Sequence, residues 1–187
     1  MAAKTRYSAT DIDIEPLNLS EDLSDFSCGN IELDDFFHKE VVLCCRYKYL
    51  TAYAVRSIKS GEIIGLFTLS NDIVSLDNED IEDLKEGVSG EYKYIFGNQS
   101  SFPAVNIGHL AIKKNLQSKG IGRLVILYIC HIFIQYRFTG VQFITVDSLN
   151  NPRTNKFYAK NRFLNQSNRD INQKTRRMYL SLMDYIE

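Results

Sequence analysis

Residues 117–122, Gln-Ser-Lys-Gly-Ile-Gly, have the types and the spacing needed to hold an anion. Gly120 and Gly122 let the backbone approach a ligand closely and adopt positive φ. The segment follows an apolar strand pattern and opens a long apolar helix pattern, whose first turn offers unpaired N–H groups and the positive end of a dipole. Lys119 and Arg123 add positive charge. This combination suits a pyrophosphate group.

Known phosphate loops set limits on this interpretation. The segment lacks the G-x-x-x-x-G-K-[ST] pattern of a P-loop, and Val125 occupies the third glycine position of the dinucleotide pattern G-x-G-x-x-G. A helix start that needs small residues for packing explains the two glycines equally well. The hexapeptide alone therefore leaves a phosphate loop and a packed helix start as alternatives.

Three side chains are suited to hold or move a proton. Tyr158 is either a general acid or an aromatic that packs a helix against a sheet. His109, in an apolar strand pattern, is either a base or site-lining residue or simply a hydrogen-bonded strand residue. Asp147 either orients an amine or acts as a base, or it caps or binds a turn, and we prefer the turn interpretation. The four cysteines and three histidines show no metal-ligand spacing, so no metal site is expected.

The elements that must position these residues follow from periodicity. Strand patterns cover about 12–17, 51–58, 62–70, 104–112, 141–146 and 178–183, and helix patterns cover about 31–47, 120–137 and 151–161. Asn30 is expected to cap the first helix, and Ser20 to cap a short turn or helix that ends at Asp25. This order predicts a single α/β domain over 1–187, with a mixed sheet flanked by helices.

Two segments lie outside these patterns. Residues 1–10 are expected to form a loose leader. Residues 71–102 are polar and acidic and contain several glycines, so we interpret them as an acidic insert between the third and fourth strands, with one helix near 81–85. Connections of this length are often functional.

The composition is that of an ordinary globular chain. Of the 187 residues, 44% are hydrophobic and 24% are charged, which fits one domain with its own core. There is no signal-peptide pattern and no apolar run of about 18 residues, the length of a membrane span. A cytoplasmic protein with reduced thiols is therefore expected.

Charge gives little support for nucleic-acid binding by the whole chain, because the formal net charge is −1. The distribution is less even, since residues 153–177 carry eight lysines and arginines against the single acid Asp170. That stretch is either an ordinary solvated surface or a face that binds phosphate, of a cofactor or of an RNA. On charge patterning alone we prefer the solvated surface.

Three pieces of the sequence together resemble the GCN5-related N-acetyltransferases (GNATs). Gln117, Gly120 and Gly122 fill the family's acetyl-CoA motif, Q/R-x-x-G-x-G/A. Upstream, residues 108–112 resemble G-x-L-A-V of the fourth strand, and downstream, residues 151–158 resemble N-x-x-A-x-x-F-Y. The pieces occur in the family's order and at its spacing. The resemblance implies an α/β GNAT fold, whose mixed, mostly antiparallel sheet is splayed between the fourth and fifth strands.

The resemblance also implies roles for single residues. Main-chain groups of the fourth strand would bind the pantetheine arm of acetyl-CoA like an added strand, and the loop amides would bind its pyrophosphate. Tyr158 would protonate the leaving thiolate, with His109 as a second catalytic candidate. The implied cofactor-binding set is Leu110, Ala111, Ile112, Gln117, Ser118, Lys119, Gly120, Ile121, Gly122, Arg123 and Asn151.

Two departures from the GNAT pattern bear on these roles. Thr154 replaces the usual alanine of the downstream motif, which is a mild change. Arg162 stands where the glycine of a G-F pair normally lies, before Phe163. Because that turn favours positive φ, the loop after Tyr158 is expected to differ.

The start of the chain resembles a narrower branch of the family. Phe26, Cys28-Gly29, Leu33 and Phe36-Phe37 are similar to the F-x-C-G…L-x-x-F pattern of the acetyltransferase toxins of toxin–antitoxin pairs, which acetylate aminoacyl-tRNA. Members of that branch often carry arginine where this chain has His109, and they tend to be basic. The branch therefore explains the architecture better than it explains the substrate.

The sequence predicts an acetyl-CoA-dependent enzyme that transfers an acetyl group to a primary amine by direct attack. A small-molecule or protein amine is the expected acceptor, and aminoacyl-tRNA is the alternative that net charge does not favour. A non-catalytic acyl-CoA-binding module is a further alternative. No membrane partner is expected. A homodimer is common in this fold, and the sequence leaves it open together with an antitoxin partner.

Overall fold

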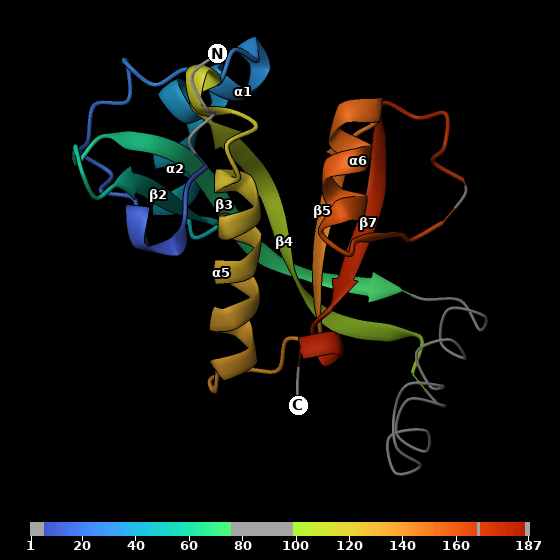
Figure 1. Ribbon diagram of the computed structural model, residues 1–187. Helices are drawn as coiled ribbons and strands as arrows, with labels where there is room; N and C mark the ends of the chain where they lie inside the picture. The colour runs from blue at the N-terminus through green and yellow to red at the C-terminus, as the bar shows by residue number, and fades with distance from the viewer. Residues whose placement is uncertain (1–5, 76–98, 168, 186–187) are drawn as a thin grey trace. The chain divides into compact units, whose positions relative to one another are not determined.

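The computed structural model describes residues 6–75, 99–167 and 169–185, and its elements are shown in Figure 1. The chain divides into two compact units. Unit 1 comprises Met1–Ser70 and Ile107–Ile132, and unit 2 comprises Asn71–Asn106 and Phe133–Glu187. Of the helices in the described ranges, none is long and apolar enough to cross a membrane.

In the described part of the chain, seven strands follow the hydrogen-bonded order β1-β2-β3-β4-β5-β7-β6 (Figure 1). Their bounds are β1 Ile12–Pro16, β2 Thr51–Ser57, β3 Ile63–Ser75, β4 Ser101–Ile112, β5 Phe143–Leu149, β6 Leu164–Asn165 and β7 Thr175–Ser181. β1 with β2, β2 with β3, β5 with β7 and β6 with β7 are antiparallel, whereas β4 and β5 are parallel. The predicted mixed sheet is confirmed.

The parallel register between β4 and β5 is short and lies within unit 2. It joins Ala104–Asn106 to Phe143–Thr145. β3 and β4 each contribute one end to unit 1 and the other end to unit 2.

In unit 1, the helix predicted over 31–47 forms as three consecutive segments. They are α1 Ile31–Asp35, the π-helical η2 Phe36–Glu40 and α2 Val41–Arg46. Asn30 caps α1 as predicted, since its side chain accepts a hydrogen bond from the Leu33 N–H at 3.2 Å. The π-helical turn was not predicted, and it buries the consecutive Phe36 and Phe37.

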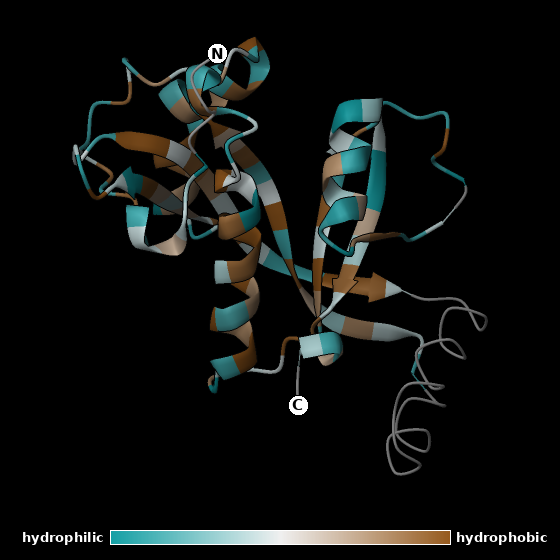
Figure 2. Cartoon of the chain, in the orientation of Figure 1, coloured by the Kyte–Doolittle hydropathy of each residue, from teal (hydrophilic) through white to brown (hydrophobic). Residues whose placement is uncertain are grey.

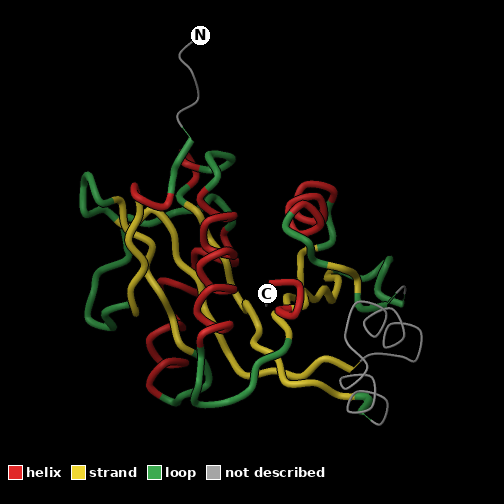
Figure 3. Tube along the Cα trace, turned by 60° about the horizontal axis from the view of Figure 1, so that its bottom comes forward, coloured by secondary structure: helices red, strands yellow, loops and turns green. Residues whose placement is uncertain are grey.

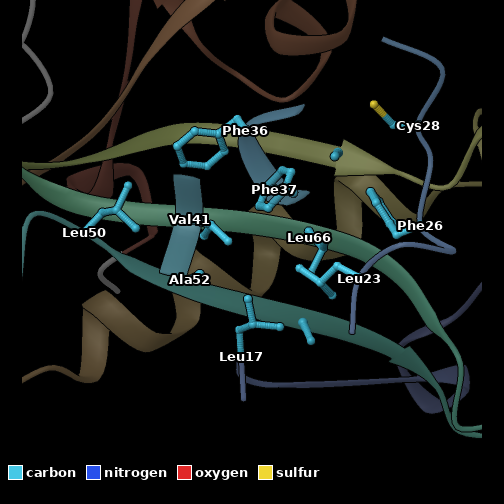
Figure 4. Packing of buried hydrophobic residues seen from close by; sticks show 12 residues of the cluster. Leu17, Leu23, Phe26, Cys28, Phe36, Phe37, Val41, Leu50, Ala52 and Leu66 are labelled. Atoms are coloured by element: carbon cyan, nitrogen blue, oxygen red, sulfur yellow. The ribbon is translucent and has the colours of Figure 1, made fainter. Parts of the chain in front are cut away.

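The core of unit 1 forms where these segments pack on β2 and β3. Figure 4 shows the ring of Phe37 and the side chain of Val41 over the strands that carry Ala52 and Leu66. Its buried members are Leu17, Leu23, Phe26, Cys28, Phe36, Phe37, Val41, Leu50, Ala52, Ala54, Leu66 and Ala111. Full burial of one such large side chain contributes about 1.5–3 kcal/mol.

The long helix α5 spans Ile121–Gln135 and runs beside the strands of unit 1 (Figure 3). Its buried residues are Ile121, Val125, Ile126, Ile129 and Cys130, which recur at helical spacing. α5 is predominantly hydrophobic in Figure 2, whereas α6, Pro152–Lys160, is mainly hydrophilic. The predicted helices over 120–137 and 151–161 are confirmed, with ends shifted by one or two residues.

A tight turn at Cys28-Gly29 holds the start of α1. The Asp34 carboxylate accepts hydrogen bonds from the Cys28 N–H at 2.8 Å, the Ser27 hydroxyl at 2.7 Å and the Gly29 N–H at 3.3 Å. Desolvation raises the pKa of Asp34, but these bonds outweigh it and hold that pKa below its ordinary value. Desolvation also raises the pKa of the Cys28 thiol to about 11, so Cys28 is inert packing.

Asp34→Asn is expected to lower the free energy of unfolding by about 1–3 kcal/mol, because an amide replaces the charged acceptor of three donors. The stabilisation by Asp34 is present above its unfolded pKa, near 4, and is lost as the pH falls through its lower folded pKa. Urea unfolding at pH 7 measures the effect, and the exposed Asp25→Asn is the control. Equal effects of the two substitutions would contradict this role.

Unit 2 is built around β5 and β7, which pair over seven residues from Phe143↔Ser181 to Leu149↔Thr175. Its core holds Val74, Phe102, Ala104, Phe143 and Tyr179. The rings of Phe102 and Tyr179 each meet the ring of Phe143 edge-on, with centroids 5.7 Å apart. α6 packs on β5.

Several predicted boundaries were wrong. Of the turn or helix predicted after Ser20, turns form and no helix does, and Ser20 is not a cap, since its N–H and hydroxyl donate to Asn18 Oδ1 at 3.1 and 2.8 Å. The predicted insert 71–102 is shorter, since β3 runs to Ser75 and β4 begins at Ser101, while the helix expected near 81–85 lies outside the described residues. β5 and β7 are shifted by two or three residues, and the two-residue β6 was not predicted.

The described end of the predicted loose leader, residues 6–10, is ordered. The Tyr7 N–H donates to the Lys119 carbonyl at 2.9 Å. Ala9–Asp11 forms a 3-10 turn, η1, whose capping box pairs Ser8 with Asp11. The segment that leads into β1 is therefore hydrogen-bonded to the loop that precedes α5.

Candidate cofactor site and catalytic residues

The loop before α5 has an irregular backbone. It follows the 3-10 turn η3, Lys114–Leu116, and contains two residues with positive φ, Ser118 at 62° and Gly120 at 93°. Gly120 also starts α5, because its carbonyl accepts the Leu124 N–H at 3.2 Å. Ser118 is exposed and holds an uncommon conformation for a non-glycine residue. A loop of this shape at the start of a helix is an anion-binding geometry.

The predicted cofactor-binding residues around the loop differ in exposure. Ile121 is buried and anchors α5 in the core of unit 1. Lys119 and Gly122 are partly exposed, and Arg123 is exposed on the first turn of α5. Cations and main-chain amides at the start of a helix suit a phosphate, so the residues present fit a pyrophosphate group.

Gln117 lies inward rather than toward a ligand. Its Nε2 donates to the Cys28 carbonyl at 2.7 Å and to the Ile112 carbonyl at 3.1 Å. The Lys114 N–H also donates to the Ser27 carbonyl at 2.9 Å. Gln117 therefore ties the Cys28-Gly29 turn to the end of β4 and to the loop. These hydrogen bonds hold the loop in place.

Gln117→Met is expected to lower the free energy of unfolding by about 1–3 kcal/mol, because it removes both donors while keeping the side-chain volume. Urea unfolding measures the loss. Gln135→Met, at the exposed end of α5, makes the same chemical change without breaking these bonds. If the Gln117→Met and Gln135→Met proteins are equally stable, the two hydrogen bonds of Gln117 do not contribute to the free energy of unfolding.

The end of β4 carries three predicted pantetheine-binding residues, Leu110, Ala111 and Ile112. Ala111 is buried, while Leu110 and Ile112 are partly exposed. The end of β4 packs closely on β3, because a β-carbon built on Gly65 would lie 2.9 Å from Ile112 Cδ1 and 3.2 Å from the Ala111 carbonyl oxygen. Gly65 therefore sets the position of this strand end.

His109 is held by ring stacking and by Thr68. Its ring stacks on Phe36 with centroids 3.6 Å apart and planes 8° apart, and its edge faces Phe37. Thr68 Oγ1 accepts the His109 backbone N–H at 3.0 Å and lies 3.1 Å from Nδ1. Desolvation lowers the pKa of His109, so the ring is neutral at pH 7. These contacts favour the packing interpretation of His109 over a role as base.

Tyr158 is the buried aromatic of α6. Its side chain is 6% exposed, and its ring meets Phe157 and Phe163 edge-on, with centroids 5.0 and 5.2 Å apart. Within the described residues no hydrogen bond to its hydroxyl is formed. Desolvation raises the pKa of Tyr158 above its ordinary value. The phenol is therefore protonated at neutral pH, as a general acid must be.

Comparison with known proteins gives a structural match. No family model and no curated protein matches the sequence. A structure of AtaTR bound with AcCoA is 21% identical, with a TM-score of 0.68 over 94% of this chain and 96% of that chain. AtaT complexed with acetyl-methionyl-tRNAfMet is 21% identical, with a TM-score of 0.71 over 94% and 97%. A mutant of KacT is 19% identical, with a TM-score of 0.72 over 93% and 96%.

The chain has the GNAT fold. The predicted fold class is thereby confirmed. The structural resemblance extends to the toxin-like branch, since a structure of the toxin AtaT bound to part of the antitoxin AtaR is 21% identical and shares the fold at a TM-score of 0.69.

The two departures from the GNAT sequence pattern leave its backbone intact. Arg162 has a φ of 68°, so it adopts the left-handed conformation that glycine usually supplies, and its guanidinium lies over the Tyr185 ring at 5.5 Å. The expected change in this loop is therefore wrong as to backbone conformation. The Thr154 hydroxyl donates to Asn151 Oδ1 at 3.1 Å, which reinforces the cap of α6.

Asn151, a member of the predicted cofactor-binding set, is the N-cap of α6. Its Oδ1 accepts the Thr154 N–H at 3.0 Å. This hydrogen bond fixes the start of the helix that carries Tyr158. Pro152 lies in the first turn of α6.

A polar cluster in unit 2 was not recognised from the sequence. The Arg177 guanidinium donates to the Asp72 carboxylate and, at 2.8 Å, to Asp147 Oδ2. The Thr145 hydroxyl also donates to Asp72 and accepts from Asn106 Nδ2 at 3.1 Å. Asp147 is therefore an ion-pair partner within a strand rather than a turn cap. The one signal of this cluster in the sequence was Thr145, a polar residue inside an apolar strand pattern.

Proposed function

We propose that this chain is an acetyl-CoA-dependent N-acetyltransferase whose acceptor is the α-amine of an aminoacyl-tRNA. The observation that carries the proposal is the structural match over about nine-tenths of the chain to AtaT, solved with acetyl-methionyl-tRNAfMet, and to AtaTR, solved with AcCoA. The loop at 117–122 and the buried Tyr158 support it independently.

Acetyl-CoA would supply an activated acyl group as a thioester. The loop amides, Lys119 and Arg123 would hold its phosphates at the start of α5. Main-chain groups of Leu110 to Ile112 would hold the pantetheine arm. In the reaction the amine nitrogen forms a bond to the acyl carbon, the C–S bond breaks, and the thiolate takes a proton.

Tyr158 would give that proton to the sulfur. Its phenol is buried and neutral, and the rings of Phe157 and Phe163 fix its position. The α6 cap at Asn151 orients the helix that carries it. The attacking amine loses its own proton to water or to a base. Positioning of amine and thioester supplies much of the rate.

The net charge of the chain spoke against a tRNA acceptor, but the local distribution of charge in unit 2 supports one. In unit 2, Asp147 and Asp72 pair with Arg177, and Asp170 accepts the Arg177 N–H at 2.6 Å, so these acids are engaged. The exposed bases on and after α6 are Arg153, Lys156, Lys160, Arg162, Arg169 and Lys174. A local basic face of this kind attracts a phosphate backbone even when the whole chain is nearly neutral.

The acceptor is tested by transfer of a labelled acetyl group from acetyl-CoA. The assay compares aminoacyl-tRNA, the same tRNA without its amino acid, the free amino acid and a lysine-rich protein. The proposal predicts label on aminoacyl-tRNA alone, with a rate that falls as salt increases. Label on the free amino acid or the protein, with aminoacyl-tRNA inactive, would overturn the acceptor and keep the enzyme class.

We also propose an antitoxin-like protein partner, and a cytoplasmic location with it, because AtaT was solved with the antitoxin AtaR and their complex was solved bound to DNA. Co-expression of this chain with the protein encoded beside it, followed by gel filtration, tests the partner. Co-elution at a larger size supports the proposal, and separate elution contradicts it.

A further inference from the structure

We infer that Arg6 is a phosphate ligand of the cofactor, so that the segment before β1 forms part of the acetyl-CoA site. The inference rests on the proposed function, since it adds a residue to the same site. It begins from the position of the Arg6 side chain. A β-carbon built on Gly120 would lie 3.2 Å from Arg6 Nε and 3.3 Å from Arg6 Cγ.

The backbone fixes Arg6 at that place. The adjacent Tyr7 donates its N–H to the Lys119 carbonyl at 2.9 Å, which joins the segment to the loop itself. The capping box of Ser8 and Asp11 then orders η1, and β1 follows directly at Ile12. Arg6 therefore reaches the loop from an anchored segment, although its side chain is exposed.

Within the described ranges, the charges around Arg6 have no ion-pair partner of opposite sign. Arg6 at Gly120, Lys119 in the loop and Arg123 on the first turn surround the N-terminal end of α5, where the helix dipole already disfavours cations. Among the described residues, the ion pairs involve none of these three side chains. A bound anion would relieve this repulsion, and a guanidinium can donate two parallel hydrogen bonds to phosphate oxygens.

The position at Gly120 assigns Arg6 to the pyrophosphate rather than to the adenosine 3′-phosphate, because the loop amides at Gly120 are the expected pyrophosphate donors. Arg6→Ala should therefore weaken acetyl-CoA and 3′-dephospho-CoA alike. It should leave acetyl-pantetheine, which has no phosphate, unaffected. Arg6→Lys keeps the charge without the paired donors and should show a smaller loss.

Calorimetric titration with acetyl-CoA and 3′-dephospho-CoA, together with turnover of acetyl-pantetheine, tests the assignment. Arg6→Ala is expected to bind both CoA forms about tenfold more weakly, with the KM for acetyl-pantetheine unchanged. Arg46→Ala, an exposed arginine at the end of α2, is the matched control and should bind as the wild type does. Equal melting temperatures would show that each variant is folded.

Three results would overturn the inference. If the wild type binds acetyl-CoA and Arg6→Ala binds it equally well, Arg6 is not a phosphate ligand, and the proposed function is unaffected. An equal loss with acetyl-pantetheine would show that Arg6 supports the loop rather than a phosphate. Absence of acetyl-CoA binding by the wild type would overturn the proposed function and the inference together.

Discussion

Tyr158→Phe is expected to lower kcat by about 10²- to 10⁴-fold while the affinity for acetyl-CoA stays that of the wild type. The substitution removes only the hydroxyl that would protonate the thiolate. The ring contacts to Phe157 and Phe163 remain, and no described residue loses a hydrogen bond, so stability should not change. Steady-state transfer of acetyl from acetyl-CoA, with calorimetry for binding, measures both quantities.

Tyr128→Phe is the matched control for this prediction. It removes a partly buried tyrosine hydroxyl that donates to the Ile14 carbonyl at 3.3 Å, outside the proposed chemistry. Its kcat should stay close to that of the wild type. If the Tyr158→Phe enzyme keeps the kcat of the wild type, the Tyr158 hydroxyl has no part in catalysis and the residue only packs.

The raised pKa of Tyr158 also bears on the pH dependence of the rate. An acid whose pKa lies above its ordinary value of about 10 stays protonated up to that pH. The rate of the wild type should therefore show no fall through ionisation of Tyr158 below about pH 10. A loss of rate between pH 7 and 9 that Tyr158→Phe abolishes would contradict this assignment.

Gly120→Glu is expected to abolish acetyl-CoA binding. The new carboxylate would stand where the pyrophosphate should lie, and the φ of 93° strains any residue other than glycine. At a concentration 100 times its Kd, acetyl-CoA should stabilise the wild type by about 2.7 kcal/mol. The Gly120→Glu protein should gain no stability. Thermal unfolding with and without acetyl-CoA measures the difference.

Gly61→Glu separates loss of the site from backbone strain. Gly61, in the turn between β2 and β3, has a φ of 70° and nothing within 4 Å of a built β-carbon. The substitution therefore adds the same strain and the same charge away from the loop. It should lower the melting temperature but keep the shift with acetyl-CoA. If the Gly120→Glu protein keeps this shift, the loop is not part of the cofactor site.

Local patterns in the sequence predicted much of this fold. Periodicity found the long helix after Gly120, the two strands β2 and β3, and the helix α6. These features depend on residues close in sequence, so a short window contains their cause. Strand ends were less certain, since tertiary pairing extends or trims a strand irrespective of its own pattern.

Residues brought together over long distances were beyond such reasoning. The sequence placed Gln117 in a cofactor motif, but not its hydrogen bond to Cys28, 89 positions away. Arg6 was assigned to a loose leader, although it lies against Gly120. The pairing of Arg177 with Asp72 likewise depends on the order of strands in the sheet. In each case the contact follows from topology, which no local pattern encodes.

His109 shows how structure shifts the balance between two interpretations of one residue. Its place in the sequence admitted a base, but its ring stacks on Phe36 and contacts Thr68. Phe36 belongs to the pattern that resembles the toxin branch. The pattern and the histidine are therefore parts of one packing unit.

The central claim is that this chain binds acetyl-CoA, and calorimetric titration of the wild type with acetyl-CoA and with CoA tests it most directly. The account predicts saturable binding of both ligands at one site per chain, and competition between them. A wild-type protein that is folded and releases no heat with either ligand would contradict the account and leave residues 117–122 as the packed start of α5.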